Sequence, residues 1–170
     1  VPAGRTGSLT IPEGIEVIGF GAFEDSKLSE IKFLDNANIL SFGYRAFYNA
    51  DGITEMHIPA SVVAIDYYAF AMCDNLQTVT FAENNNLKGV YEGAFYGCKN
   101  LSDIMLPDSI VEISDFAFYG CRKLTDVPVS ETTGLKGIYD YAFAYAGFGG
   151  DYTTPETLID IGSYAFMGNM

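Results

Sequence analysis

The sequence has no tryptophan, a single histidine and few cations, with 9 Lys and Arg against 22 Asp and Glu and a formal net charge of −13. A chain this acidic is repelled by nucleic-acid phosphates and by anionic lipid surfaces, and its largest basic cluster is Arg122-Lys123. It also lacks an uninterrupted apolar run of the roughly 20 residues that cross a bilayer. We therefore expect no nucleic-acid partner and no direct membrane insertion.

The sequence is equally poor in groups for catalysis. A nucleophile or a general acid/base needs a partner that orients it, and the only imidazole, His57, has no candidate beyond a neighbouring carboxylate such as Glu55. The Gly-rich segment 147–150 lacks the lysine and the strand-loop-helix setting of a phosphate-binding loop. We expect a protein that is not an enzyme, with no catalytic residue, no cofactor and no metal ligand set.

What the sequence has in abundance is repetition. An Ala-Phe pair recurs at steps of 24, 23, 25, 23, 25 and 23 residues, as Ala22-Phe23, Ala46-Phe47, Ala69-Phe70, Ala94-Phe95, Ala117-Phe118, Ala142-Phe143 and Ala165-Phe166. A fixed period of this length is typical of a solenoid. Apolar residues also recur eight and five positions before each repeat Phe, so each coil can bury the same face against its neighbours.

After each repeat Phe, apolar residues two positions apart and flanked by polar ones indicate a short strand with one buried face. We expect strands at 8–11, 30–33, 55–58, 78–81, 103–106, 126–129 and 151–154. Strands that recur once per coil in one direction stack as one parallel sheet. The segment that leads into Ala-Phe has apolar residues at i, i+3, i+7 and i+8, and this spacing predicts short helical or 3₁₀ returns.

The expected fold class is α/β, a solenoid of about seven coils of 23–25 residues. Residues 1–7 are an irregular lead-in, and residues 8–170 form a single solenoid that is incomplete at its C-terminal end. Short coils join strand to return by a Pro turn, as at Pro59, and long coils by a polar joint two residues longer, such as 82–86, so two coils are the true repeat. Pro128 lies in an expected interior strand, where it removes one hydrogen bond.

Three cysteines stand three residues after a repeat Phe, at a position that is small in every other coil; they are Cys73, Cys98 and Cys121. Because the position requires a small side chain, we expect buried free thiols that pack as apolar groups. A disulfide between stacked neighbours or a reactive thiol is the alternative. A zinc site would need converging ligands that include His or a CxxC pair, and the sequence has neither.

This pattern resembles the BspA-like, or treponemal-type, leucine-rich repeats. The residues that carry the resemblance are 58–62 (IPASV), 69–73 (AFAMC) and 76–81 (LQTVTF), and it extends over Leu9 to Met170. The resemblance implies a leucine-rich-repeat solenoid from a secreted or cell-surface bacterial protein, and hence an extracellular location. It also implies an adhesin-like module that binds a protein partner, such as a host matrix or cell-surface protein.

The outward-facing strand positions form two columns, which we expect to be the protein-binding surface on the curved sheet face. They contain Glu30, Glu55, Thr78, Asp103 and Asp126 in the first column, and Lys32, His57, Thr80 and Met105 in the second. Three interpretations stay open: a solvated face, an acidic stripe that complements a basic partner segment, and a weak calcium site between Asp103 and Asp126. Oxygen ligands suit calcium, but no calcium-loop motif is present.

A second candidate surface is aromatic, because Tyr48, Tyr96 and Tyr119 each follow a repeat Phe. These side chains either shield the edge of the core or remain exposed. Exposed Tyr is favoured at protein interfaces and also suits stacking on sugar rings. The alternative function is therefore carbohydrate or cell-wall binding through this aromatic edge, and a third is a structural spacer that holds other domains away from the cell.

Overall fold

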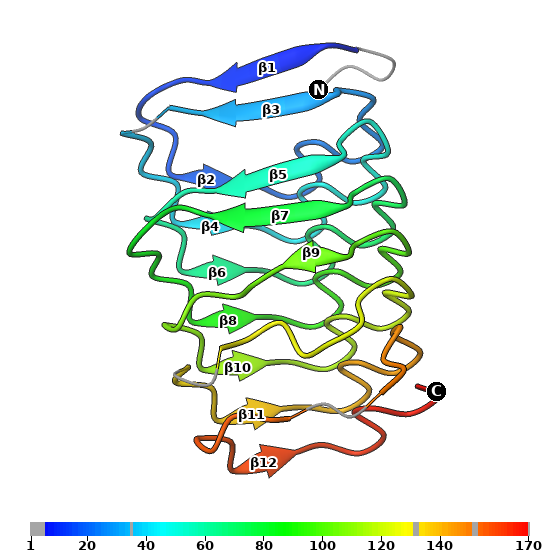
Figure 1. Ribbon diagram of the computed structural model, residues 1–170. Helices are drawn as coiled ribbons and strands as arrows, with labels where there is room; N and C mark the ends of the chain where they lie inside the picture. The colour runs from blue at the N-terminus through cyan, green and yellow to red at the C-terminus, as the bar shows by residue number, and fades with distance from the viewer. Residues whose placement is uncertain (1–5, 35, 131–132, 151–152, 170) are drawn as a thin grey trace.

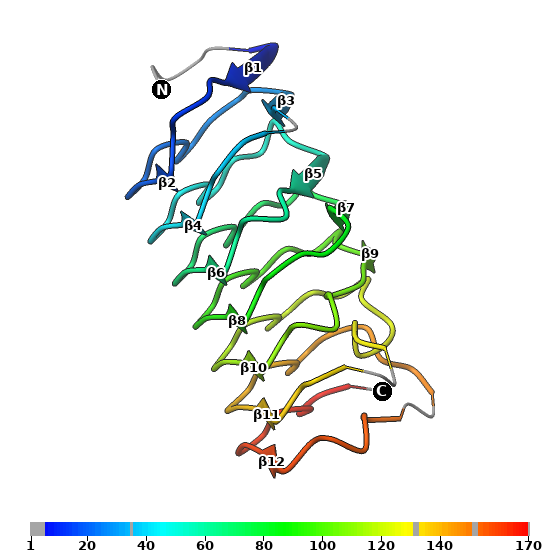
Figure 2. The same cartoon turned by 90° about the vertical axis from the view of Figure 1, so that its left-hand side faces the viewer.

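The computed structural model describes residues 6–34, 36–130, 133–150 and 153–169. The expected solenoid is confirmed, with coils stacked along one axis (Figure 1) and a column of strands on each of two sides (Figure 2). The front strands are β1 (Ser8–Ile11), β3 (Glu30–Phe33), β5 (Glu55–Ile58), β7 (Thr78–Phe81) and β9 (Asp103–Ile104). The rear strands are β2 (Val17–Ile18), β4 (Ser41–Phe42), β6 (Ala64–Ile65), β8 (Gly89–Val90), β10 (Glu112–Ile113), β11 (Gly137–Ile138) and β12 (Asp160–Ile161).

The rear strands form one parallel sheet of seven strands, in the order β12-β11-β10-β8-β6-β4-β2. The second residue of each rear strand stands five positions before a repeat Phe, and it is buried in every coil except the last. A strand of two residues shows no alternation of apolar and polar positions. The sequence therefore identified the buried column but not the strands that contain it.

The front strands do not form the single sheet that we expected. β1 pairs with β3, β5 with β7, and β7 with β9, but β3 and β5 are not hydrogen-bonded neighbours. Pairing extends over four residues where fewer residues separate the paired positions in the sequence, as for Ser8 with Glu30 and Glu55 with Thr78. It extends over only two residues where the separation is larger, as for Thr78 with Asp103. The extra residues of a long joint lie between β3 and β5 and between β7 and β9, so equivalent residues do not face each other along the whole strand.

Three of the expected front strands are changed or fall partly outside the described residues. The strand expected at 103–106 ends at Ile104, and residues 126–129 form no strand. Pro128 has no amide hydrogen for a ladder, and the amide of Val129 instead donates to Val127 in the same coil (2.8 Å). The strand expected at 151–154 includes residues 151–152, which lie outside the described residues, and 153–154 are not in a strand.

The returns contain no helix among the described residues, and so no helix that could span a membrane. Their amides alternate between two kinds of partner. The amide of Phe95 donates to Ala117 in the next coil (2.8 Å), whereas the amide of Tyr96 donates back to Gly93 in its own coil (2.9 Å). A helix would direct every amide into its own segment. The expectation of helical returns is therefore wrong, because half of these amides link neighbouring coils.

This alternation depends on left-handed backbone at two positions in each coil, two residues before and two after the repeat Phe. Glycine occupies both positions around Phe95, with φ of 62° at Gly93 and 72° at Gly97. Other coils place side chains there in spite of the steric cost, and the residues two before Phe with φ of 55–58° are Arg45, Tyr68, Phe116, Tyr141 and Tyr164. The backbone conformation is thus imposed by the stacked coils and not by the local residue type.

The seven repeat Phe rings form one internal stack. Consecutive ring centroids lie 5.1, 4.7, 5.3, 5.2, 5.2 and 5.6 Å apart, with interplanar angles of 10° or less. Each inner ring therefore packs against a ring on both sides. In the first and last of the described coils, apolar side chains such as Phe20 and Ile159 are exposed.

Replacing Phe118 by Ala should lower the free energy of unfolding by about 3–5 kcal/mol, because its fully buried ring lies 5.2 Å from both Phe95 and Phe143. Tyr119→Ala should cost far less, since Tyr119 is only half-buried. Urea unfolding followed by circular dichroism measures both. Equal losses would mean that Phe118 does not lie in the core.

Candidate binding surfaces

The structure brings most of the expected acidic surface onto one side of the solenoid. Glu30, Glu55, Thr78 and Asp103 begin β3, β5, β7 and β9, and Lys32, His57, Thr80 and Met105 stand two residues further along the chain. All are exposed except Thr78, which is half-buried. The two predicted columns of outward-facing residues are therefore present in four successive coils.

Asp126 does not extend this surface as a strand residue. Because residues 126–129 form no strand, the carboxylate of Asp126 accepts a hydrogen bond from the amide of Val127 (2.8 Å). Among the described residues, no group of three or more His, Cys, Asp or Glu side chains is placed to hold a metal ion. Asp103 and Asp126 thus have no third acidic ligand near them in the described part of the chain.

A groove of about 600 Å³ runs between β3 and β5, and we call it the front groove. It opens where the two strands fail to pair, so that each strand presents an unpaired edge to the other. Its lining includes Glu30, Lys32, Glu55, His57 and Thr80. The groove was not evident from the sequence, because the break between β3 and β5 depends on how the coils stack.

The polar contacts inside the front groove are few. Lys32 Nζ lies 3.2 Å from Glu30 Oε2, an exposed pair that contributes little stability. His57 Nδ1 is hydrogen-bonded to Thr80 Oγ1 on the adjacent strand (2.9 Å). The structure thus brings the imidazole to a hydroxyl, whereas the sequence suggested Glu55 as its partner.

The aromatic edge is divided between coils. Tyr96 and Tyr119 are stacked with ring centroids 4.9 Å apart and an interplanar angle of 3°. Tyr48 does not join them, because the coil between carries Ala71 at this position, and its ring instead lies 4.0 Å from the Arg45 guanidinium carbon. Of the three tyrosines singled out in the sequence, only two therefore share a site.

Tyr96 and Tyr119 line a second groove, of about 760 Å³, which we call the tyrosine groove. Tyr145 also lines this groove, with its ring at 71° to that of Tyr119 and a centroid distance of 5.4 Å. Burial, and then the neighbouring phenols of Tyr96 and Tyr145, raise the pKa of Tyr119. The remaining lining residues are Met72, Gly97, Lys99, Gly120, Arg122, Ala146, Gly147, Phe148 and Gly168.

Sequence analysis did not identify Lys99, Gly97, Gly120, Arg122 and Tyr145 as site residues. They stand two or four positions after a repeat Phe, where the residue type varies from coil to coil. One feature of the sequence could have indicated this groove. Two successive coils carry Gly two residues after the repeat Phe and a cation four residues after it. The close approach of these columns to the Tyr stack depends on the left-handed turns, which the sequence did not reveal.

The three cysteines are buried and free, as expected. Each Sγ donates a hydrogen bond to a backbone carbonyl of an earlier coil, at 3.0–3.2 Å, and the acceptors for Cys73, Cys98 and Cys121 are Phe47, Phe70 and Phe95. Burial raises the pKa of Cys73 to about 12 and raises the pKa values of Cys98 and Cys121 as well. The thiol form therefore persists to higher pH in the folded chain than in the unfolded one.

In the folded protein at about pH 8 none of the three thiols should react with dithiobis(2-nitrobenzoate), because the thiolate is the nucleophile. All three should react once guanidinium chloride unfolds the chain. Absorbance of the released thionitrobenzoate counts the reacted thiols. Rapid reaction of one thiol in the folded protein would show that the coil around it is open to solvent.

Comparison with known proteins agrees with this geometry. Residues 5–87 and 82–170 match the family described as the BspA type leucine-rich repeat region, with six copies. No curated protein matches the chain. Among solved structures, a leucine-rich repeat protein from Eubacterium ventriosum ATCC 27560 is 27% identical, with a TM-score of 0.81 over 95% of this chain and 42% of its own.

Two further structures share the fold. A leucine-rich cell surface protein from Faecalibacterium prausnitzii A2-165 is 21% identical, with a TM-score of 0.75 over 96% of this chain and 45% of its own. The T. pallidum leucine-rich repeat protein is 22% identical, with a TM-score of 0.77 over 91% of this chain and 72% of its own. The chain thus spans less than half the length of the first two of these proteins.

The repeated Ala-Phe coil, the stacked Phe rings and the family match lead to the same conclusion. The fold is the repeat fold found in bacterial surface proteins. The chain belongs to the BspA-type leucine-rich repeat family.

Proposed function

We propose that this chain is a non-enzymatic, adhesin-like module that binds a protein partner through the front groove. The observation that carries the proposal is the break between β3 and β5, which leaves two unpaired strand edges in a groove lined by Glu30 and Glu55. Its partner is a basic, extended segment of a host matrix or cell-surface protein.

The groove offers both parts of strand-like peptide recognition. Unpaired strand edges supply backbone hydrogen bonds, which give affinity, and side chains along the groove give specificity. Glu30 and Glu55 stand at the start of the two facing strands, and Asp103 continues the acidic column on β9. An acidic wall attracts a cationic segment and raises its association rate.

The proposed location is extracellular, on a secreted or surface-attached bacterial protein. It is supported by the family match and by the similar fold of a leucine-rich cell surface protein. Because the chain spans less than half of that protein, we propose a binding role for this part of the chain only. A role without catalysis fits the pairing of His57 with Thr80 and the burial of all three thiols.

Charge reversal in the groove tests this function. The double variant Glu30→Lys with Glu55→Lys should bind purified host matrix proteins about tenfold or more weakly, because it places like charges against the basic segment. Surface plasmon resonance at two salt concentrations measures the change, and higher salt should weaken the wild-type interaction.

The matched control is Glu16→Lys with Glu156→Lys, which changes the net charge equally at two exposed residues outside the groove. This control should retain binding. If it weakens binding as much as the groove variant does, overall charge and not the front groove determines the interaction. If the wild-type protein binds no matrix or cell-surface protein, the solenoid would instead serve as a spacer.

A further inference from the structure

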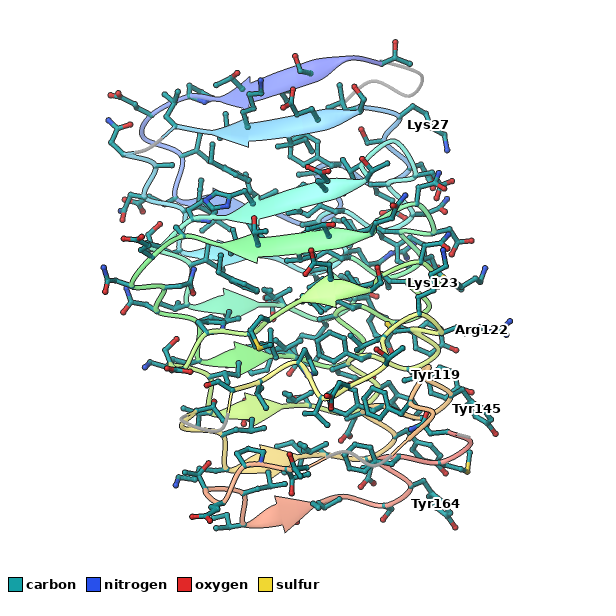
Figure 3. All side chains as sticks on the ribbon, viewed as in Figure 1. Lys27, Tyr119, Arg122, Lys123, Tyr145 and Tyr164 are labelled. Atoms are coloured by element: carbon teal, nitrogen blue, oxygen red, sulfur yellow. The ribbon has the colours of Figure 1, made fainter. Side chains whose placement is uncertain are left out.

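We propose that the tyrosine groove is a separate binding site for a sugar that bears a carboxylate, such as a uronic acid within an oligosaccharide. The site lies along the edge of the solenoid that carries Tyr119, Arg122 and Tyr145, and the Arg122 side chain extends outward there (Figure 3). It shares no lining residue with the front groove. At about 760 Å³ it is large enough for a ligand of two or three sugar rings.

The wall of the groove is suited to the apolar face of a sugar ring. Tyr96 and Tyr119 are stacked with nearly parallel rings, so each covers one face of the other, and the ring of Tyr145 lies at 71° to that of Tyr119. The negative face of an aromatic ring attracts the polarised C–H groups of a pyranose. The phenolic hydroxyls can donate to and accept from sugar hydroxyls.

The floor is open at Gly120, one of two successive glycines at the same left-handed position. Gly97 and Gly120 have φ of 72° and 71°. A Cβ on Gly120 would meet only the Cα of Gly97, at 3.9 Å, so the space above it is empty of protein atoms. Four other coils fill this position with larger residues, namely Asp25, Asn49, Met72 and Tyr145, and the last coil has Gly168 there. The opening is therefore at Gly120, whereas a Cβ on Gly97 would lie 2.7 Å from Met72 Sδ.

The charge at the rim comes from the column four residues after each repeat Phe. In this column Lys27 pairs with Asp51 (3.1 Å) and Lys99 with Asp74 (2.8 Å), each across adjacent coils. The next cation, Arg122, has no hydrogen bond or ion pair with any of the residues that the structure describes.

Within its column of the described residues, Arg122 lacks a partner because its neighbour in the next coil is Gly147. A Cβ on Gly147 would lie 2.2 Å from the carbonyl oxygen of Arg122, so no acidic side chain fits there. The two earlier cations in this column are each neutralised by an Asp. The guanidinium of Arg122 is thus available to a carboxylate from outside, which it can bind in a bidentate manner.

A sugar fits this site better than an acidic peptide does. The floor amides are already used between coils, since Gly97 donates to Tyr119 (2.8 Å) and Gly120 donates to Ala144 (2.9 Å). An added peptide strand would therefore find no free strand edge to pair with. The available groups are instead aromatic faces, phenolic hydroxyls and one cation, which match the ring, hydroxyls and carboxylate of an acidic sugar.

Isothermal titration calorimetry with trigalacturonate, and with its fully methyl-esterified counterpart, tests the assignment on the whole chain. The wild-type protein should bind the acid about tenfold or more tightly than the ester. Arg122→Gln should reduce binding of the acid to about the level of the ester and leave the ester unchanged. Lys123→Gln removes an adjacent cation that does not line the groove, and it should leave binding within about twofold of wild type.

Two further variants separate the groove from general effects on folding or charge. Gly120→Asn fills the floor with a residue that tolerates positive φ, as Asn49 does in an earlier coil, and it should abolish binding of acid and ester alike. Glu30→Lys with Glu55→Lys should retain sugar binding, so that failure of the proposed protein-binding function is distinguishable from failure here.

The proposal is overturned if neither trigalacturonate nor a second acidic sugar, sialyllactose, binds the wild-type protein. It is also overturned if Arg122→Gln and Lys123→Gln weaken binding equally, since that indicates diffuse charge and not a site. Binding of hexaglutamate with the same dependence on Arg122, in the absence of any sugar binding, would assign the groove to acidic peptides instead.

Discussion

The structure depends on the hydrogen bonds that cross from one coil to the next on both sides of each repeat Phe. The amides of the repeat Phe and of the residues two before and two after it donate to the following coil, as Gly93, Phe95 and Gly97 do. The intervening amides close tight turns within the coil. This alternation fixes the spacing of the coils at the Phe rings, whose centroids lie 4.7–5.6 Å apart. Stacking one coil on the next therefore buries the Phe rings and, at the same time, provides hydrogen-bond acceptors for the backbone amides around them.

The same spacing explains why surface features occur as columns. A side chain at a given position has its equivalent one coil away, close enough to stack or to form an ion pair. Tyr96 meets Tyr119, and Lys99 meets Asp74, in this way. Substitutions within a column therefore set the local surface, as Glu30 and Glu55 do in the front groove and Gly147 does beside Arg122. None of these residues belongs to the hydrophobic core.

Departures from regularity provide the openings. The break between β3 and β5 creates the front groove, and Gly120 leaves the floor of the tyrosine groove open. Pro128 ends the front column by removing a donor, and Asp126 then bonds to Val127 instead of facing a neighbouring strand. A perfectly regular solenoid would have had a continuous front sheet and a filled edge, and it would have offered a partner only a smooth surface.

The sequence by itself determined the coil length, the buried columns, the four complete front strands and the burial of the three thiols, because each follows from a side-chain type that recurs at a fixed period. It predicted helical returns wrongly, since apolar spacing of i, i+3, i+7 and i+8 also fits a turn whose amides alternate between coils. Only the tertiary structure decided the left-handed backbone at residues such as Tyr68 and Phe116, the split of the front sheet, and the placement of Tyr119 and Arg122 in one groove. These features arise from contacts between coils, and the physical reason is that a hydrogen bond or a groove shared by two coils is not encoded in the periodicity of either one.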